Sequence, residues 1–255
     1  MRVLAIGDVV GSCGCQRLKT ALPELKKWSK ADLTIVNGEN SADSNGISRS
    51  SASLIFSCGA DIITTGNHVY RQREIYDELD REAGIIRPAN YHPDAPGTGS
   101  YLFEKGRFRA LVVNLSGQLF MEAYESPFAC IDRLLAKNNV RIVIVDIHAE
   151  ATSEKTALAC HLDGRVSLVF GTHTHVQTAD EKILPGGTGY ITDLGMCAAA
   201  DSVLGMKKDL AVRRLITKMP ERFEPALGSC LINGIFAEID DNTGKTIHIE
   251  RINLI

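Results

Sequence analysis

The pentapeptide Gly171-Thr172-His173-Thr174-His175 carries the clearest chemical signal in the chain. It follows the apolar run at residues 166–170, which predicts a buried strand. Alternate side chains of an extended segment project to the same side, so we expect both imidazoles to point into one cavity. Neutral imidazole is a common metal ligand, and the pair could bind one cation or two adjacent cations. Two packed or surface histidines are the alternative interpretation, and the choice depends on whether the chain supplies further ligands.

Side chains with ligand chemistry follow four more predicted strands, each at the point where an apolar run ends. They are Asp8, then Glu39 and Asn40, then Asn67 and His68, and finally His148. Binding sites in open α/β sheets lie at the carboxyl ends of the strands. Together with the two histidines, five strand ends carry donors, which chance turn residues do not readily explain. We therefore predict that these residues converge on one site.

The predicted donor set suits two divalent cations. It contains two carboxylates, two side-chain amides and three or four imidazoles, and no thiolate. Mixed oxygen and nitrogen donors favour Mn, Fe or Zn, whereas Mg and Ca suit the set less well. Two such cations with Asp8, Glu39 and a bridging hydroxide leave one net positive charge, which suits an anionic phosphate. A pair of metals about 4 Å apart clamps a phosphoryl group and lowers the pKa of the attacking water.

The elements that must position these residues alternate between strand and helix. In the first third of the chain, the predicted strands are residues 3–7, 33–37 and 61–65, and the predicted helices are residues 15–29, 48–58 and 73–83. This alternation indicates βαβ units with parallel strand pairing.

The rest of the chain combines hairpins with two further strand–helix pairs. Predicted strands span residues 101–104, 107–115, 140–147, 183–184, 189–192, 229–240 and 246–254, and predicted helices span residues 128–137, 153–161 and 208–217. Thr152 or Ser153 is expected to cap its helix, and residues 195–205 are expected to form a loop rich in glycine and alanine. Because no repeat or linker is evident, residues 1–255 are expected to form a single domain.

The ordered motifs around the candidate ligands resemble those of the calcineurin-like metallophosphoesterases. The motifs are Gly-Asp-x-x-Gly at residues 7–11, Gly-Glu-Asn at 38–40, Gly-Asn-His at 66–68, the strand-final His148, and Gly-Thr-His-Thr-His at 171–175. The fuller similarity is to the bacterial YmdB-like branch, through residues 36–40, 87–90, 148–155, 172–180 and 191–196. It covers about the first 205 residues and continues weakly to the end. The resemblance implies an α/β fold in which two mixed β-sheets pack face to face with helices outside, a four-layer sandwich.

The same resemblance implies a role for each candidate residue. The first metal would take Asp8, Glu39, Asn40 and His175, and the second would take Glu39, Asn67, His148 and His173, so that Glu39 bridges the two. His68 would be the catalytic general acid or hydrogen-bond donor beside the substrate. Most members of the superfamily have a histidine where this chain has Val10, and Asn40 is implied to replace it. No substrate-binding residue is assigned.

Several positions depart from the family pattern or have more than one interpretation. Tyr70-Arg71 stands where the family has Trp-Asp, and Cys15 stands where it has arginine. Four basic residues could contact a phosphate, although solvated surface charge is the expected role for each; they are Arg71, Arg73, Arg87 and Lys155. Asp193 follows a predicted strand and is expected to orient a ligand. The glycines at residues 7, 11 and 14 lack the G-x-G-x-x-G pattern and the P-loop lysine, which argues against dinucleotide or NTP binding.

These residues predict a dinuclear-metal phosphodiesterase in which a metal-bridging hydroxide attacks phosphorus in line and His68 assists the leaving oxygen. The resemblance implies small phosphodiesters as substrates, cyclic nucleotides such as 2′,3′-cyclic nucleoside monophosphates among them. The alternatives are a phosphomonoesterase with the same site and a non-catalytic nucleotide-binding regulator. A dinucleotide-dependent oxidoreductase is a more distant alternative.

Composition limits the partners and the compartment. The chain has 255 residues, 44% of them hydrophobic, and a formal net charge of -3, so no stable nucleic-acid complex is expected. It has neither a secretory signal pattern nor an apolar run of roughly 20 residues, which predicts a cytoplasmic protein without membrane contact. Seven cysteines without C-x-x-C spacing predict free thiols in a reducing compartment, with Cys13 and Cys15 as small residues at a helix start. A homo-oligomer is compatible with this composition.

Overall fold

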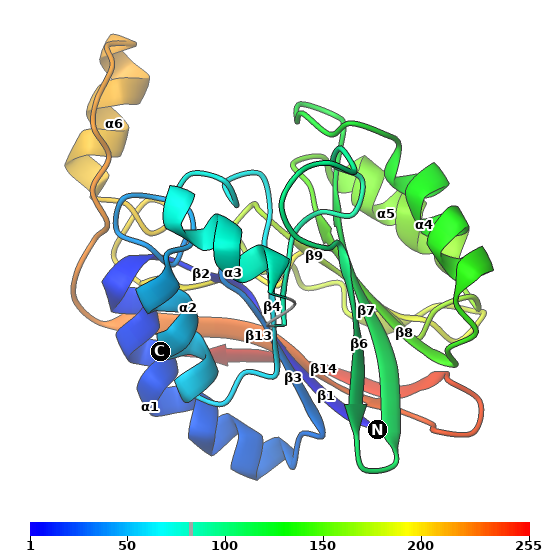
Figure 1. Ribbon diagram of the computed structural model, residues 1–255. Helices are drawn as coiled ribbons and strands as arrows, with labels where there is room; N and C mark the ends of the chain where they lie inside the picture. Colours follow the sequence, from blue (N-terminus) through cyan, green and yellow to red (C-terminus); the bar gives the residue numbers. More distant parts are fainter. Residues whose placement is uncertain (82–83) are drawn as a thin grey trace.

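Two β-sheets lie face to face in the computed structural model, which describes residues 1–81 and 84–255 (Figure 1). In this part of the chain the larger sheet has the strand order β2-β12-β13-β1-β3-β4-β5, with β14 paired to β13. Its strands are β1 Arg2–Ile6, β2 Asp8–Val9, β3 Leu33–Asn37, β4 Ile62–Thr64, β5 Ile85–Ile86, β12 Met196–Ala199, β13 Cys230–Ile239 and β14 Thr246–Leu254. Strand β1 runs parallel to β3 and antiparallel to β13, so the sheet is mixed.

The smaller sheet has the order β10-β11-β9-β8-β7-β6 among the described residues and is also mixed. Its strands are β6 Ser100–Lys105, β7 Phe108–Ser116, β8 Ile142–His148, β9 Leu168–Thr172, β10 Lys182–Ile183 and β11 Gly189–Ile191. The four central strands run parallel, whereas β6 and β10 pair antiparallel at the two edges.

Alternating side chains divide the core into layers. In β1, Val3 and Ala5 pack between the sheets, whereas Leu4 and Ile6 point outward against helices. Helices α1 Gly11–Ser29, α2 Arg49–Ser57 and α3 Tyr76–Asp80, with the 3-10 turn η1 Arg73–Ile75, cover the outer face of the larger sheet. Helices α4 Pro127–Lys137 and α5 Thr152–Leu162 cover the smaller sheet (Figure 1). The predicted arrangement of two packed mixed sheets with helices outside is therefore confirmed.

Some predicted boundaries are wrong for local reasons. Helix α1 begins four residues early, at Gly11, whose φ of +58° makes the turn from the preceding strand. The helix predicted at residues 73–83 ends at Asp80, and residues 82 and 83 lie outside the described part of the chain. Helix α5 is preceded by Ala151 without a side-chain cap, so neither Thr152 nor Ser153 caps it. None of the described helices is long and apolar enough to cross a lipid bilayer.

The expected loop at residues 195–205 contains a strand instead. Strand β12 is fully buried and lies between β2 and β13. Gly14 of α1 allows the helix to pack closely against this strand, because a side chain at Gly14 would start 2.1 Å from the Cys197 carbonyl oxygen. The strand thus fixes the position of Asp8 on β2 beside it.

An arm leaves the larger sheet after β12 and returns at β13; we define it as residues 200–228. It carries helix α6 Lys208–Thr217, which stands out from the body at the upper left of Figure 1. The two segments at the root of the arm pair with each other, through a bridge of Met206 with Pro225 and a hydrogen bond of 2.8 Å from Ala226 N–H to Gly205 carbonyl oxygen.

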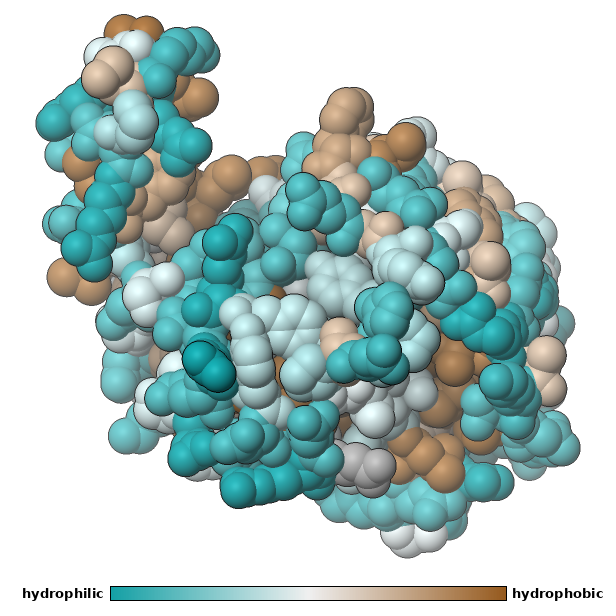
Figure 2. Space-filling view, turned by 45° about the horizontal axis from the view of Figure 1, so that its top comes forward, coloured by the Kyte–Doolittle hydropathy of each residue, from teal (hydrophilic) through white to brown (hydrophobic). Residues whose placement is uncertain are grey.

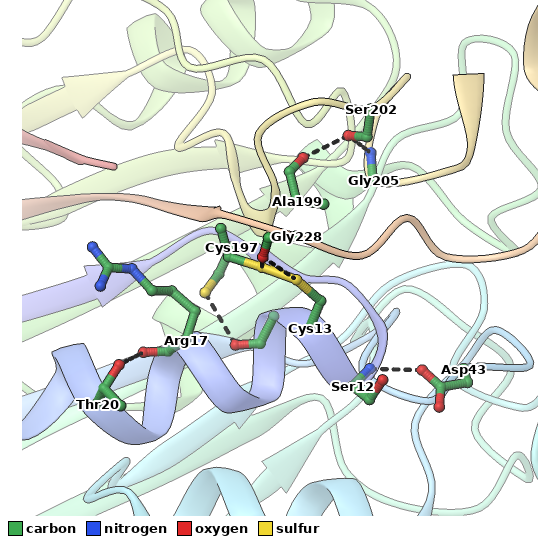
Figure 3. Close-up of a disulfide and its surroundings, with 12 residues drawn as sticks. Ser12, Cys13, Arg17, Thr20, Asp43, Cys197, Ala199, Ser202, Gly205 and Gly228 are labelled. Atoms are coloured by element: carbon green, nitrogen blue, oxygen red, sulfur yellow. Dashed lines mark hydrogen bonds between the residues drawn. A yellow bond between two sulfur atoms is a disulfide. The ribbon is translucent and has the colours of Figure 1, made fainter. Parts of the chain in front are cut away.

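A disulfide joins Cys13, in the first turn of α1, to Cys230, the first residue of β13 (Figure 3). It therefore ties the returning end of the arm to the helix that follows Asp8. The prediction that all cysteines are free thiols is wrong for these two. Five other cysteines are free: Cys15, Cys58, Cys130, Cys160 and Cys197.

Candidate metal centre

Both sheets deliver the predicted ligands to one place. Asp8 lies on β2, Glu39 and Asn40 follow β3, and Asn67 and His68 follow β4 of the larger sheet. The smaller sheet contributes His148, the last residue of β8, and the two histidines after β9. The convergence arises because the carboxyl ends of the parallel strands of both sheets meet at the same edge of the sandwich.

One group of donors surrounds the ring nitrogen Nε2 of His148. This atom lies 3.0 Å from Asn67 Oδ1, 3.2 Å from Glu39 Oε1 and 3.1 Å from His173 Nδ1. The ligand atoms of Glu39, His148 and His173 all lie within 4.8 Å of one another. This spacing is suitable for donors that share one cation.

In each of the two imidazoles, one ring nitrogen makes a hydrogen bond outside the donor group, and this bond determines that the other nitrogen faces the group without a proton in the neutral ring. His148 Nδ1 lies 2.9 Å from Thr172 Oγ1, whose own proton is donated to Asp146 Oδ1 at 2.7 Å, so the hydroxyl accepts from His148. His173 Nε2 lies 3.0 Å from the Glu150 carboxylate and donates to it. With both rings neutral, the lone pairs of His148 Nε2 and His173 Nδ1 would face each other, and either a metal ion or a proton between the donors removes their repulsion.

In the protein without a metal, a proton has that role. Burial by itself would lower the pKa of His148, but the neighbouring Glu39 carboxylate outweighs burial and raises it to about 9. Burial together with the charge on His148 lowers the pKa of His173 to about 3. Burial would raise the pKa of Glu39, but His148 holds it well below its usual range. One proton therefore occupies a place where the donors would fit a divalent cation.

A second group of donors surrounds Asp8. Its Oδ2 accepts a hydrogen bond of 3.1 Å from His173 N–H, whereas its buried Oδ1 has no hydrogen-bond partner among the described residues and lies 3.6 Å from His175 Nε2. His175 Nδ1 donates to the carbonyl oxygen of Leu204 at 3.0 Å, which leaves the lone pair of Nε2 directed toward Asp8. Burial raises the pKa of Asp8. An orphaned buried carboxylate oxygen beside an unprotonated imidazole nitrogen fits a metal ligand pair.

Asn40 also lies in this second group, but its amide nitrogen, and not its amide oxygen, faces the other donors. Its Nδ2 lies 3.3 Å from His175 Nε2, and its Oδ1 lies 3.1 Å from His68 Nδ1. A half-turn of the amide would exchange the two atoms and direct the oxygen to the donors. A ligand role for Asn40 therefore requires that half-turn.

Glu39 touches both groups. Its Oε1 lies 3.2 Å from His148 Nε2 and accepts from Asn40 Nδ2 at 2.9 Å, so the carboxylate has a position suited to bridging. Gly66 makes room for it, since a side chain there would start 2.4 Å from Glu39 Oε2 and 2.3 Å from His148 Nε2. The glycine before Asn67 is thus required by the site itself.

His68 lies at the edge of both groups and is half-buried. Its Nδ1 is 3.2 Å from Glu39 Oε1, and its backbone N–H donates to Glu39 Oε2 at 3.1 Å. The side chain lines a hollow of about 780 Å³ in which the site opens to solvent. The imidazole therefore borders both the donor groups and the space in front of them.

The two closely spaced histidines meet the site by a different geometry from the one predicted. Strand β9 ends at Thr172, and the backbone then turns with φ of +99° at His173 and +63° at His175. The segment is not extended, and the rings go to different donor groups. Positive φ values at non-glycine residues are sparsely populated and persist only where neighbouring contacts hold them.

Asp193 supplies those contacts. Its Oδ2 accepts from Thr174 N–H at 3.1 Å and from Thr174 Oγ1 at 2.8 Å, and the Lys155 ammonium lies 2.7 Å away. The expectation that Lys155 is a solvated surface charge is wrong, because its side chain is buried in this ion pair. The same expectation is wrong for Arg87, which is buried and donates to backbone carbonyl oxygens, whereas Arg71 and Arg73 are exposed.

Two residues to which the sequence motifs assigned no role, Asp146 and Thr172, hold His148 in place through hydrogen bonds. Asp146 is buried and accepts hydrogen bonds from Thr64 Oγ1 at 2.5 Å and from Asn37 Nδ2 at 3.2 Å, besides the one from Thr172. A signal was available, because a carboxylate two residues before His148 in an apolar strand must lie on the same face as that histidine.

Comparison with known proteins gives one family over nearly the whole chain. A family model described as YmdB-like protein matches residues 4–252. The chain is 45% identical over 255 residues to the 2′,3′-cyclic-nucleotide 2′-phosphodiesterase of Bacillus subtilis, and the match covers 99% of this chain and 96% of that protein.

Two crystal structures match the fold closely. One, of a phosphatase described as novel from Mycoplasma pneumoniae, has a TM-score of 0.94 and 35% identity and covers 100% of this chain and 93% of that one. The other, of a hypothetical protein from Thermus thermophilus, has a TM-score of 0.95 and 39% identity and covers 99% and 98% of the two chains.

Proposed function

The chain belongs to the YmdB-like protein family, and from that premise we propose that it is a metal-dependent phosphodiesterase that hydrolyses nucleoside 2′,3′-cyclic phosphates. The observation that carries the proposal is the meeting of two donor groups around Glu39, with Asp8 Oδ1 left without a hydrogen-bond partner among the described residues. The likeness to a Bacillus subtilis enzyme named for this substrate supports the choice of substrate.

The two donor groups are proposed to hold two divalent ions, with Fe, Mn or Zn as the candidates. Asp8, Glu39, Asn40 and His175 would bind the first, and Glu39, Asn67, His148 and His173 would bind the second. When bound, such ions would supply positive charge for the phosphoryl oxygens and would lower the pKa of a bound water molecule.

His68 is proposed to give a proton to the leaving oxygen. Its Nδ1 faces Glu39 and Asn40, so Nε2 is the nitrogen that is free to face the substrate. In the reaction, a water molecule gives up one proton to the solvent as its oxygen forms a bond to phosphorus. The bond from phosphorus to the ribose O2′ breaks, O2′ takes a proton from His68, and His68 regains a proton from the solvent. The product is a nucleoside 3′-phosphate, and a general acid of this kind contributes about 10²–10⁴-fold.

The test is hydrolysis of adenosine 2′,3′-cyclic phosphate by the full chain loaded with Mn²⁺, Fe²⁺ or Zn²⁺. We expect a His68→Asn variant to retain its metal content and lose about 10²–10⁴-fold in kcat. His248→Asn, at an exposed histidine far along the chain, is the matched control and keeps full activity. Full activity after complete removal of metal would refute the proposal.

Two other outcomes would support the alternatives. Release of inorganic phosphate from adenosine 3′-phosphate at a rate equal to cyclic-phosphate opening would indicate a phosphomonoesterase with the same site. Tight binding of the cyclic nucleotide without turnover, in both the wild type and His68→Asn, would indicate a non-catalytic regulator.

A further inference from the structure

The hollow in front of the donor groups has two chemically different walls. On the body side it is lined by site residues such as Glu39, His68 and His175. On the other side it is lined by the arm, through apolar residues that include Leu204, Leu215 and Phe223. Its volume of about 780 Å³ lies in the range of sites that bind small organic ligands.

The apolar wall is unusually open to solvent. Leu215 is 64% exposed, Phe223 is 40% exposed, and Leu204 is 46% exposed. Figure 2 shows apolar surface on the arm and at its junction with the body. Contiguous exposed apolar side chains around one hollow are typical of a binding surface, whereas apolar side chains that are exposed singly are common on any protein surface.

A hydrogen bond connects the apolar wall to the donor groups. The carbonyl oxygen of Leu204 accepts the hydrogen bond from His175 Nδ1 at 3.0 Å, so the same residue touches a proposed ligand and lines the hollow. Farther along the arm, the Arg214 guanidinium lies 4.8 Å from the centre of the Phe223 ring, a favourable cation–π contact. A molecule held at the donor groups would therefore lie beside Leu204, and Leu215 and Phe223 line the same hollow.

We propose that the arm is the nucleobase-binding half of the substrate site, with the base packed against Leu204, Leu215 and Phe223. The proposal rests on the proposed function, since it takes the phosphodiester to lie at the donor groups. A base is planar and apolar on its faces, which suits this wall, whereas the phosphate and ribose suit the polar side. Contact through the face of a ring does not distinguish one base from another, so we expect modest base preference.

The experiment compares two substrates and three variants of the metal-loaded full chain. Adenosine 2′,3′-cyclic phosphate carries the base, and the 2,3-cyclic phosphate of methyl riboside lacks it. Leu215→Ala and Phe223→Ala are expected to raise KM for the adenosine substrate about 10-fold and to leave KM for the riboside unchanged. Ile216→Ala is the matched control, because Ile216 is adjacent on α6, is 75% exposed and is not among the residues that line the hollow.

Equal kcat/KM for the two substrates in the wild type would overturn the inference and leave the proposed function intact. Loss of turnover of both substrates in the metal-loaded wild type would instead contradict the proposed function. In that event, calorimetric titration with adenosine 3′-phosphate tests base binding by the arm alone. Weaker binding by Leu215→Ala than by Ile216→Ala would support base binding by the arm, and equal binding would refute it.

Discussion

At the scale of single residues, the site depends on a chain of hydrogen bonds beneath His148. The imidazole donates from Nδ1 to Thr172 Oγ1 at 2.9 Å, and the hydroxyl donates to Asp146 Oδ1 at 2.7 Å. Burial raises the pKa of Asp146 to about 6, so the carboxyl group is ionised above that pH and accepts these bonds. The chain fixes the ring so that Nε2 faces the other donors.

Removing the hydroxyl should therefore weaken metal binding. We expect Thr172→Val, which keeps the shape of the side chain, to lower metal affinity about 10–100-fold, because the ring loses the partner that fixes its orientation. Calorimetric titration with Mn²⁺ or Zn²⁺ measures the effect. Thr172→Ser keeps the hydroxyl and serves as the control, and equal affinities in the two variants would contradict this role of Thr172.

The proton on His148 predicts how metal affinity depends on pH. The pKa of His148 is raised to about 9, so the metal-free protein keeps this proton at neutral pH and must release it when a metal binds. The proton competes with the metal below that pKa. We therefore expect affinity to rise up to about tenfold per pH unit from roughly pH 7 to 9 and then to level off.

Titrations in buffers of different ionisation enthalpy measure the number of protons released. Release of about one proton near pH 7 and none near pH 10 is the expected pattern. Affinity that does not change across this range would show that His148 is already neutral in the metal-free protein.

At the scale of elements, the disulfide connects the start of β13, to which the arm returns, with the helix that follows Asp8 in sequence. Cys13 and Cys230 are 217 residues apart in sequence, so the bond closes most of the chain into a loop. In Figure 3 it lies beside Cys197 of β12, whose Sγ donates to Gly14 carbonyl oxygen at 3.3 Å. The bond thus joins α1 and β13 where β12 already packs against α1.

Loss of this bond should destabilise the fold. We expect the double variant Cys13→Ala and Cys230→Ala to lose about 2–4 kcal/mol in the free energy of unfolding, because the unfolded chain regains the entropy of the open loop. Denaturant unfolding measures it. Dithiothreitol should lower wild-type stability by the same amount and leave the double variant unchanged.

Cys160→Ser is the control for that experiment, since Cys160 is an exposed free cysteine on α5. Its stability and its response to reductant should equal those of the wild type. A wild type that is insensitive to reductant would show that the bond contributes nothing to stability.

At the scale of the whole molecule, the donor groups join the two sheets. Glu39 follows a strand of the larger sheet, His148 ends a strand of the smaller one, and their side chains lie 3.2 Å apart. Elsewhere, much of the contact between the sheets is an apolar core that includes Ile35 and Phe170. A metal shared by these ligands would therefore hold both sheets together at this edge of the sandwich.

Metal binding should accordingly raise the thermal stability of the entire fold. At a metal concentration of about 100 times Kd, the free energy of unfolding rises by about 2.7 kcal/mol, which corresponds to ~5–10 °C in Tm for a chain of this size. Calorimetry with and without a chelator measures the shift. A Glu39→Gln variant should show no response to the chelator, and an equal response would place the stabilising ion elsewhere.

Much of the fold followed from local sequence patterns. The apolar runs predicted β3, the terminal hairpin and α6 with small boundary errors, because side-chain periodicity is a local property of the chain. Strand β12 was missed because small residues at 196–199 resemble a loop, and only its neighbours on both sides show that they are buried. The single-domain organisation, the compartment and the oligomeric state stay predictions.

The sequence by itself determined which residues could carry the chemistry. The covalent structure of each side chain decides which atoms it can donate to a metal, and the end of an apolar run predicts where a strand ends. Only the tertiary structure decided how they meet. It placed His173 and His175 in left-handed backbone instead of an extended segment, buried Lys155 against Asp193, and paired Cys13 with Cys230. The physical reason is that ring orientation, burial and pairing depend on partners distant in sequence, and no local pattern encodes those partners.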